Sequence, residues 1–165
     1  MIDSPCYFLY DDGGPFAARC SALCAAFGLG RAARPEHALF SLAPCWRRRI
    51  PTSELLAPAS GVLVFHPSPL PHGRGPDAIR AAVSAGERVG AATWFWASEG
   101  LDEGDLCEQE FFVLDPSESP GRAYHTRYVP AGVRSLSRAV CGIIDGCPRR
   151  VRQDSSLASW HAKRG

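Results

Sequence analysis

The run Gly61–Phe65 constrains the fold most, because it is continuous, apolar and rich in β-branched residues, and it ends abruptly at His66. Such runs are typical of strands that are buried on both faces of a parallel sheet. The pattern therefore predicts an α/β protein and places His66 at the carboxyl end of a strand. Ligands of open α/β sheets bind outside those ends, so this position favours a functional site.

The residues before this run predict a strand, a turn and a helix, followed by a second strand. The short apolar run Cys6–Tyr10 ends in the turn segment 11–15, and apolar residues at helical spacing then extend from Phe16 to Phe27. We expect the second strand at Leu39–Ala43. The glycines of the turn do not follow the G-x-G-x-x-G order, so no dinucleotide site is predicted.

The residues after His66 predict further helices and strands. The expected elements are a helix from Pro76, a strand at Val89–Trp96, its hairpin partner at Leu106–Leu114, and a helix at Tyr124–Ile144 with a break at Pro130–Gly132. The chain from Asp145 onward is polar and predicts a tail without a second globular unit.

Length and charge limit the classes of function. A chain of 165 residues has room for one ordinary domain, which we assign to residues 1–160, with 161–165 as a polar tail. The net charge of +1 offers no basic excess for a nucleic acid, so a small-molecule substrate is expected. No run approaches the ~20 apolar residues of a membrane helix, and the first residues lack a signal-peptide pattern. We therefore expect a cytoplasmic protein.

The seven cysteines predict reduced thiols, because their number is odd and their spacing is irregular. Cys20 and Cys24 stand one helical turn apart, but no histidine or second cysteine pair follows at zinc-finger spacing. We expect no metal. Cys107 has no base beside it in the sequence, so a nucleophilic thiol is not expected there.

Two motifs carry the candidate chemistry. His66-Pro-Ser-Pro-Leu-Pro71 is followed by Arg74-Gly75, and Gly100-Leu-Asp-Glu-Gly-Asp-Leu106 comes further along the chain. They resemble the H-P-S-x-L-P…R-G and G-L-D-T-G-D-I signatures of enzymes that move a formyl group from 10-formyltetrahydrofolate to an amine. This family includes methionyl-tRNA, glycinamide ribonucleotide and sugar-amine formyltransferases. The resemblance covers about residues 39–160, more weakly before residue 60.

The resemblance implies a fold and a set of ligands. The fold is a Rossmann-like three-layer sandwich with a mostly parallel central sheet, here shortened at its start by about one βα unit. The implied cosubstrate is 10-formyltetrahydrofolate, without a metal, and the implied partner is a small-molecule amine. The tRNA-acting members carry an additional C-terminal domain, so tRNA is a poor acceptor candidate for this chain. The oligomeric state stays open, with a homodimer among the options.

The resemblance also implies roles for individual residues. An amine that attacks a formyl carbon builds negative charge on oxygen and positive charge on nitrogen, so the site must donate to one and take a proton from the other. His66 would polarise the formyl oxygen, and Asp102 would orient the imidazole and accept the proton. Ser68 would support the loop. The implied folate-binding residues are Arg48, Arg49, Ile50, Val64, Trp96, Ala97, Ser98, Glu99 and Gly100.

Val64 departs from the family pattern. The family has an asparagine two positions before the histidine, and its amide donates a second hydrogen bond to the formyl oxygen, which valine cannot do. Losing one oxyanion donor typically costs about 10²–10³ in rate. The candidate replacements are His72, Ser68 or a backbone N–H within residues 67–75.

Three functions therefore stay open. The leading hypothesis is transfer of the formyl group to a primary amine of an amino sugar or a specialised-metabolite precursor. The second is hydrolysis of a formyl group on the same fold, with water as the nucleophile. The third is a non-catalytic relative that binds folate or a partner protein, which the missing asparagine and the shortened start together suggest.

Overall fold

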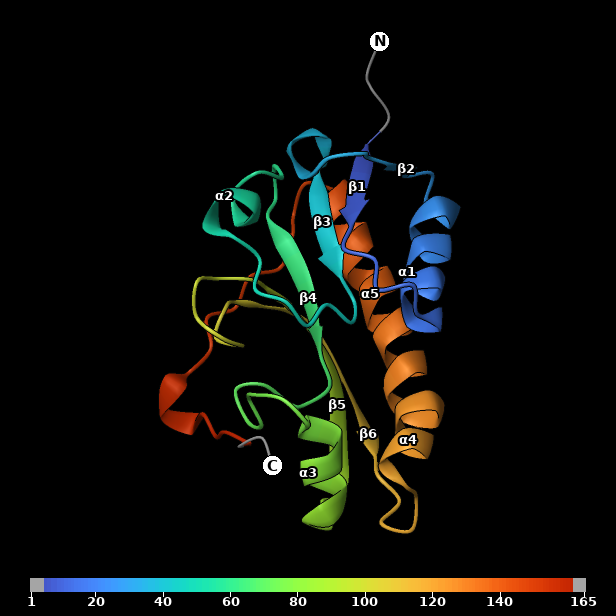
Figure 1. Ribbon diagram of the computed structural model, residues 1–165, viewed down its shortest axis with the longest axis vertical. Coiled ribbons are helices and arrows are strands. Elements are labelled where there is room, and N and C mark those ends of the chain that lie inside the picture. The colour runs from blue at the N-terminus through green and yellow to red at the C-terminus, as the bar shows by residue number, and fades with distance from the viewer. Residues whose placement is uncertain (1–4, 162–165) are drawn as a thin grey trace.

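The computed structural model describes residues 5–161, and its centre is a six-stranded sheet in the order β2–β1–β3–β4–β5–β6 (Figure 1). Neighbouring strands pair in parallel from β2 to β4, and β5 and β6 continue the sheet as an antiparallel hairpin. The strands are β1 (Cys6–Leu9), β2 (Gly30–Arg31), β3 (Phe40–Ala43), β4 (Val62–His66), β5 (Val89–Trp96) and β6 (Leu106–Val113). The expected α/β class is confirmed, and His66 is the last residue of β4.

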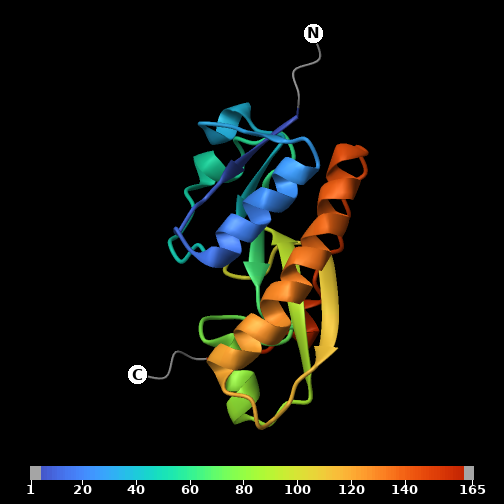
Figure 2. The same ribbon diagram turned by 90° about the vertical axis from the view of Figure 1, so that its right-hand side faces the viewer.

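Helices α1 (Pro15–Ala26) and α5 (Val129–Ile144) lie on the same face of the sheet and against each other (Figure 2). The short helix α2 (Thr52–Leu55) lies on the opposite side (Figure 1). Helices α3 (Ala78–Ser84) and α4 (Pro120–Ala123) contact each other at the far end of the β5–β6 hairpin. The sheet is therefore covered by long helices on one face and mainly by loops on the other.

Helix α1 follows from its sequence. Pro15 occupies the first turn, where a missing N–H costs nothing, and Gly28 follows the last turn with φ +76°, a conformation that glycine adopts without strain. Phe16, Cys20 and Cys24 recur at four-residue spacing, and all three side chains are buried. This spacing places them on one face of the helix, which packs into the core.

The expected break at Pro130–Gly132 is wrong, because α5 runs through these residues without interruption. The irregularity lies one turn earlier, where Tyr124–Tyr128 form a π-helical segment that joins α4 to α5. Pro130 has no N–H and its ring would clash with the carbonyl four residues before it. A π-helical turn widens the helix at that place, so the proline fits without a break.

The polar stretch from Asp145 onward, which we expected to form a tail, packs against the rest of the fold over the described residues. Val151 exchanges two backbone hydrogen bonds with Leu106, and the Gln153 side chain is buried. His161 donates its backbone N–H to the Arg74 carbonyl at 2.8 Å. Polar composition misled the prediction, since the side chains of Gln153 and Ser159 pair with backbone groups of the loops. The rest of the expected tail, residues 162–165, lies outside the described residues.

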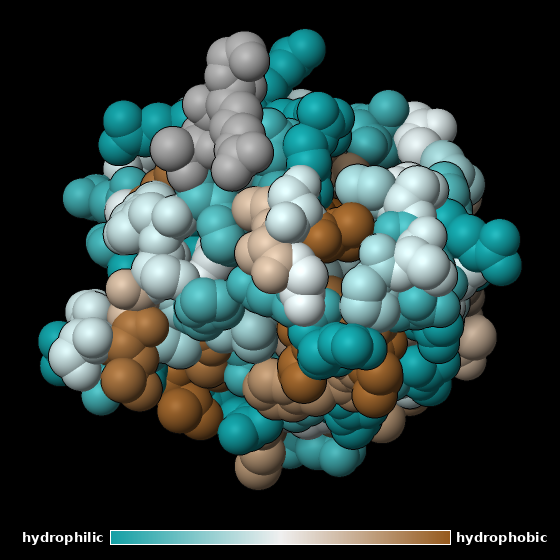
Figure 3. All heavy atoms as spheres, turned by 90° about the horizontal axis from the view of Figure 1, so that it is seen from below, coloured by the Kyte–Doolittle hydropathy of each residue, from teal (hydrophilic) through white to brown (hydrophobic). Residues whose placement is uncertain are grey.

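The surface at the end that carries α3 and α4 shows hydrophobic residues in small groups among hydrophilic ones (Figure 3). Within residues 5–161, no helix has both the length and the apolar character that crossing a membrane requires.

Helix α5 approaches the core so closely at Gly132 that the position admits no side chain. A Cβ there would lie 2.8 Å from the Phe16 ring and 2.9 Å from the Phe65 ring. We expect Gly132→Ala to lower the free energy of unfolding by about 1–3 kcal/mol through overpacking, as measured by urea denaturation. Gly121→Ala is the matched control, because a Cβ at Gly121 meets nothing within 4 Å. Equal stability of the two variants would contradict the close packing.

Candidate functional site

The side chains of β4 alternate between two environments. Leu63 and Phe65 belong to the main core beneath α1 and α5. Val62 and Val64 point to the opposite face, where they pack in a second apolar cluster with Ile50. Because alternate residues of a strand share a face, His66 projects on the same side as Val64. The candidate site thus lies on the loop-covered face of the sheet, beside this second cluster.

The imidazole of His66 is buried, with 7% of the residue exposed. Its Nε2 lies 2.8 Å from the Gly73 carbonyl oxygen. A carbonyl can only accept, so Nε2 carries a hydrogen and donates it. The other ring nitrogen, Nδ1, lies 3.7 Å from the Asp102 Oδ2 atom. Nδ1 is a donor only when the ring is doubly protonated.

Asp102 is buried in the loop between β5 and β6, with 9% of the residue exposed. Its φ of +54° lies in the left-handed region, which is uncommon for residues other than glycine. Its Oδ2 accepts a 2.8 Å hydrogen bond from the Gly75 N–H. The structure therefore brings His66 and Asp102 together, as the two motifs predict.

The way the pair is held differs from the expectation that Asp102 orients the imidazole. The 3.7 Å separation of Nδ1 and Oδ2 is longer than a hydrogen bond. Backbone groups of the loop after β4 hold each side chain instead: Gly73 holds His66, and Gly75 holds Asp102. The gap between the two side chains stays unbridged within the protein.

The three candidate replacements for the missing asparagine are all engaged elsewhere. The Ser68 hydroxyl donates to the His72 carbonyl at 2.8 Å, which braces the loop. The His72 ring nitrogens face Ser159 at 2.6 Å and Glu87 at 3.3 Å. Every non-proline backbone N–H of residues 68–75 donates a hydrogen bond within the protein. Of the groups considered, only the Nδ1 of a doubly protonated His66 is left to donate to an oxyanion.

His72, Glu87 and His161 form a group whose ligand-type atoms lie within 4.8 Å of one another. No sequence pattern pointed to this group, because the three residues come from separate segments. The expectation that the chain holds no metal stays a prediction.

The residues expected at the folate divide into two sets. Ile50, Val64 and Ala97 meet in the second apolar cluster. Arg48 and Arg49 are exposed, and the Arg48 guanidinium lies over the Trp46 ring at 5.6 Å. The two arginines therefore lie at the surface, whereas the apolar members of the set come together.

The segment after β5 offers unused backbone donors. The N–H groups of Trp96 and Ala97 are bonded to Asp105 and Val62. The N–H groups of Ser98–Gly100 have no partner among residues 5–161. Trp96 is 3% exposed, and the Arg150 guanidinium lies over its ring at 4.0 Å from the ring centroid. A planar ligand can therefore meet the backbone of this segment but not the face of Trp96 that Arg150 covers.

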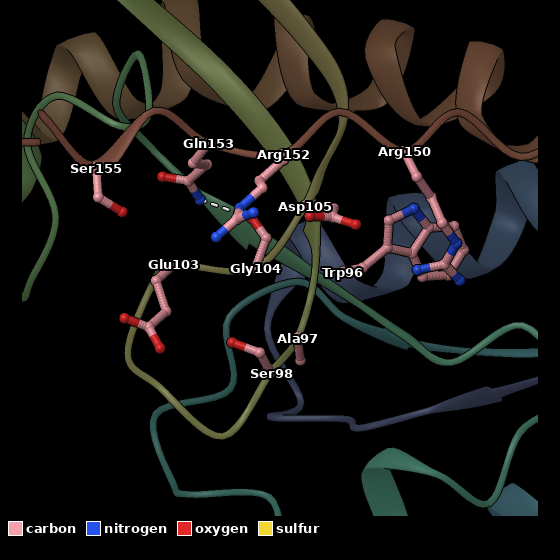
Figure 4. Close-up of a pocket in the computed structure, with 10 residues that line it drawn as sticks. All are labelled: Trp96, Ala97, Ser98, Glu103, Gly104, Asp105, Arg150, Arg152, Gln153 and Ser155. Atoms are coloured by element: carbon pink, nitrogen blue, oxygen red, sulfur yellow. Dashed lines mark hydrogen bonds between the residues drawn. The ribbon is translucent and has the colours of Figure 1, made fainter. Parts of the chain in front are cut away.

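A pocket of about 430 Å³ adjoins the same segment (Figure 4). Sequence reasoning missed its basic side, since Arg150 and Arg152 come from the stretch that was expected to be a tail. The lining residues are Trp96, Ala97, Ser98, Glu103, Gly104, Asp105, Arg150, Arg152, Gln153 and Ser155.

Burial keeps the thiols of three cysteines protonated and unreactive. It raises the pKa of Cys24 and of Cys107 to about 12, and that of Cys20 further, so all three are neutral thiols at pH 7. We expect iodoacetamide at pH 8 to label the exposed Cys141 and Cys147 and to leave the buried three intact until urea is added, as read by peptide mass spectrometry. Fast labelling of Cys107 in the folded protein would contradict its burial.

The mixed sheet, with a histidine at the end of a strand and an aspartate in the following hairpin loop, defines an α/β protein with a candidate acid–base pair. The formyl transferase family model matches residues 26–140. The chain belongs to the formyl transferase family.

Named relatives agree with this membership. Over 111 residues the chain is 33% identical to the cytosolic 10-formyltetrahydrofolate dehydrogenase of Xenopus laevis. The matched region is 67% of this chain and 12% of that protein. The chain thus corresponds to a small part of the curated relatives that it matches first.

Two solved structures show the same fold. HypX from Aquifex aeolicus in complex with tetrahydrofolic acid superposes with a TM-score of 0.85 at 21% identity, covering 98% of this chain and 30% of HypX. The N-formyltransferase of Helicobacter canadensis, in complex with folinic acid and dTDP-3-aminofucose, has a TM-score of 0.74 at 14% identity, over 97% of this chain and 71% of that one.

Proposed function

We propose that this chain is a folate-dependent N-formyltransferase that moves the formyl group of 10-formyltetrahydrofolate to a primary amine of a small metabolite. The observation that carries the proposal is the buried pair of His66 Nδ1 and Asp102 Oδ2, 3.7 Å apart at the end of β4. Formyl transfer needs a donor for the developing oxyanion and an acceptor for the amine proton. This pair offers both within reach of one reacting carbon.

The hydrogen bonds divide the two roles. Gly73 occupies His66 Nε2, so Nδ1 of the doubly protonated ring is the donor that meets the formyl oxygen. The amine nitrogen attacks the formyl carbon, and its proton passes to the Asp102 carboxylate. The tetrahedral intermediate then collapses, the bond from carbon to the folate nitrogen breaks, and that nitrogen takes up the proton held by Asp102 as tetrahydrofolate leaves. Ser68 acts indirectly by bracing the loop.

The proposed folate contacts use backbone N–H groups that have no partner within the described residues. We assign the pteridine edge to the free N–H groups of Ser98–Gly100, with the pocket beside Trp96 as the adjoining space. Its volume of about 430 Å³ falls in the range of small-molecule sites. Ile50 and Val64 supply an apolar wall, and the exposed Arg48 and Arg49 are placed to meet the negative glutamate tail.

The acceptor and setting complete the proposal. Residues 1–160 are the proposed catalytic domain, acting in the cytoplasm. The amine complex reported for the H. canadensis protein supports an amino sugar as one acceptor class, with specialised-metabolite amines as the other.

A second candidate is formyl hydrolysis, which the unbridged gap between Nδ1 and Oδ2 favours. A separation of 3.7 Å lets a water molecule contact both groups. Such a water would be activated by Asp102 and could attack the formyl carbon in place of an amine.

One assay separates these functions from simple binding. The protein is incubated with 10-formyltetrahydrofolate, with and without a pool of primary amines, and the release of tetrahydrofolate is followed. Release that requires an amine supports transfer, and release without an amine supports hydrolysis. A folate that raises the melting temperature without any release would overturn both reactions in favour of a binding protein.

A further inference from the structure

Gln153 is a buried glutamine whose carboxamide is fully used. The residue is 6% exposed. Its Oε1 accepts from Arg74 Nε at 3.3 Å and Nη2 at 2.9 Å. Its Nε2 donates to the backbone carbonyls of Asp102 at 3.0 Å and Gly104 at 2.7 Å. Figure 4 shows this side chain reaching from the C-terminal segment to the loop after β5.

The two ends of this carboxamide reach the two halves of the candidate site. On the acceptor side, Arg74 stands between Gly73, which holds His66, and Gly75, which holds Asp102. On the donor side, Gln153 bonds the backbone of Asp102 itself. One side chain therefore links the two signature loops that set the distance between imidazole and carboxylate.

Both loops need such a partner. The left-handed backbone of Asp102 is a strained conformation that surrounding contacts must maintain. Arg74 is 3% exposed, and no carboxylate within residues 5–161 lies within 4 Å of it. Its buried guanidinium therefore relies on the Gln153 oxygen as its side-chain acceptor.

We propose that Gln153 is a positioning residue, whose hydrogen bonds to Arg74, Asp102 and Gly104 fix the loops of His66 and Asp102 at their reactive separation. This inference rests on the proposed formyl transfer. An amide suits the place because it accepts on one atom and donates on the other. Glutamate would still accept from Arg74, but its ionised carboxylate would oppose the carbonyls of Asp102 and Gly104.

The test uses Gln153→Glu and Gln153→Met, because methionine keeps the length of the side chain but removes both functions. Asp154→Asn is the matched control, since Asp154 is the exposed neighbour and its cap on Ser156 needs only an acceptor. Tetrahydrofolate release is measured from pH 5 to 9, and hydrogen exchange is measured at the Gly75 amide. That amide donates to Asp102 Oδ2, so its exchange should accelerate when Asp102 moves away.

We expect kcat to fall about 10²-fold in both Gln153 variants, as for a displacement of about 1 Å between reacting groups, with a smaller change in KM. In Gln153→Glu the deficit should shrink at low pH, because protonation restores one donor. Gly75 exchange should accelerate in both variants and stay unchanged in Asp154→Asn.

Variants with wild-type kcat and wild-type Gly75 exchange would overturn the positioning role. Loss of folding in both variants, with Asp154→Asn folded, would assign Gln153 to stability and overturn it as well. If the wild-type protein releases no tetrahydrofolate, the proposed function fails, whereas the Gly75 exchange still decides whether Gln153 fixes the loop.

Discussion

Asp102→Asn is expected to slow tetrahydrofolate release by about 10²–10⁴, the range that a positioned proton acceptor contributes. The substitution keeps the size of the side chain, and an amide oxygen can still accept from the Gly75 N–H, so the loop retains its contact. What is lost is the ability to take the proton of the attacking nitrogen. The measurement is kcat with 10-formyltetrahydrofolate and the amine that supports the fastest release.

Asp115→Asn serves as the control. Asp115 is an exposed carboxyl at the turn after β6, and it is ionised at neutral pH because hydrogen bonds from Ser117 lower its pKa. The variant therefore removes a carboxylate that has no role in the proposed mechanism. It should retain wild-type kcat. His66→Gln gives a second check: if the pair acts as a unit, the double variant should lose no more activity than the worse single variant. An active Asp102→Asn protein would remove Asp102 from the mechanism.

Local sequence patterns predicted the strands that flank the candidate site, whereas His66 and Asp102 were singled out by two motifs that resemble those of the family. The apolar run before His66 stops at a proline, which fixes the end of β4. The expected strand Val89–Trp96 matches β5, since its apolar and aromatic residues are bounded by turn segments. Strand β6, Leu106–Val113, ends within one residue of its predicted boundary. Local patterning was sufficient for these elements.

The contacts that hold the site could not be predicted in this way. Gly73 and Gly75 act through backbone carbonyl and N–H groups, which leave no trace in residue type. Gln153 bonds to Asp102, which is 51 residues away in the sequence. The polar composition around Gln153 predicts an exposed segment. Such pairings depend on how distant segments pack, and local propensity carries no information about that.

The helical region shows a similar limit. Pro130 and Gly132 predict a break, because each disfavours a helix interior. In the fold, the π-helical segment Tyr124–Tyr128 accommodates the proline, and Gly132 lets α5 approach Phe16 and Phe65. The same residues that lower helix propensity thus serve tertiary packing, which the sequence pattern could not reveal.

Val64→Asn is expected to raise the rate of formyl transfer by up to about 10²-fold. Each non-proline N–H of residues 68–75, the Ser68 hydroxyl and both His72 nitrogens have partners, so His66 Nδ1 is left as the oxyanion donor among the groups considered. Position 64 projects on the same face of β4 as His66, and an amide there can supply the second donor, worth about 10²–10³ in enzymes that possess it.

The variant places a polar group in the apolar cluster of Ile50 and Ala97, so the free energy of unfolding should fall by about 1–3 kcal/mol unless the amide finds partners. Val64→Asp, measured at a pH where its carboxyl is ionised, tests for donation, because the side chain has the shape of asparagine but no donor when ionised. If kcat rises in Val64→Asn and not in Val64→Asp, hydrogen-bond donation limits the natural site. If a folded Val64→Asn protein is no faster than the wild type, a donor outside the His66 loop stabilises the oxyanion. Val64 then serves packing in the second apolar cluster, and its lack of a donor does not limit the reaction.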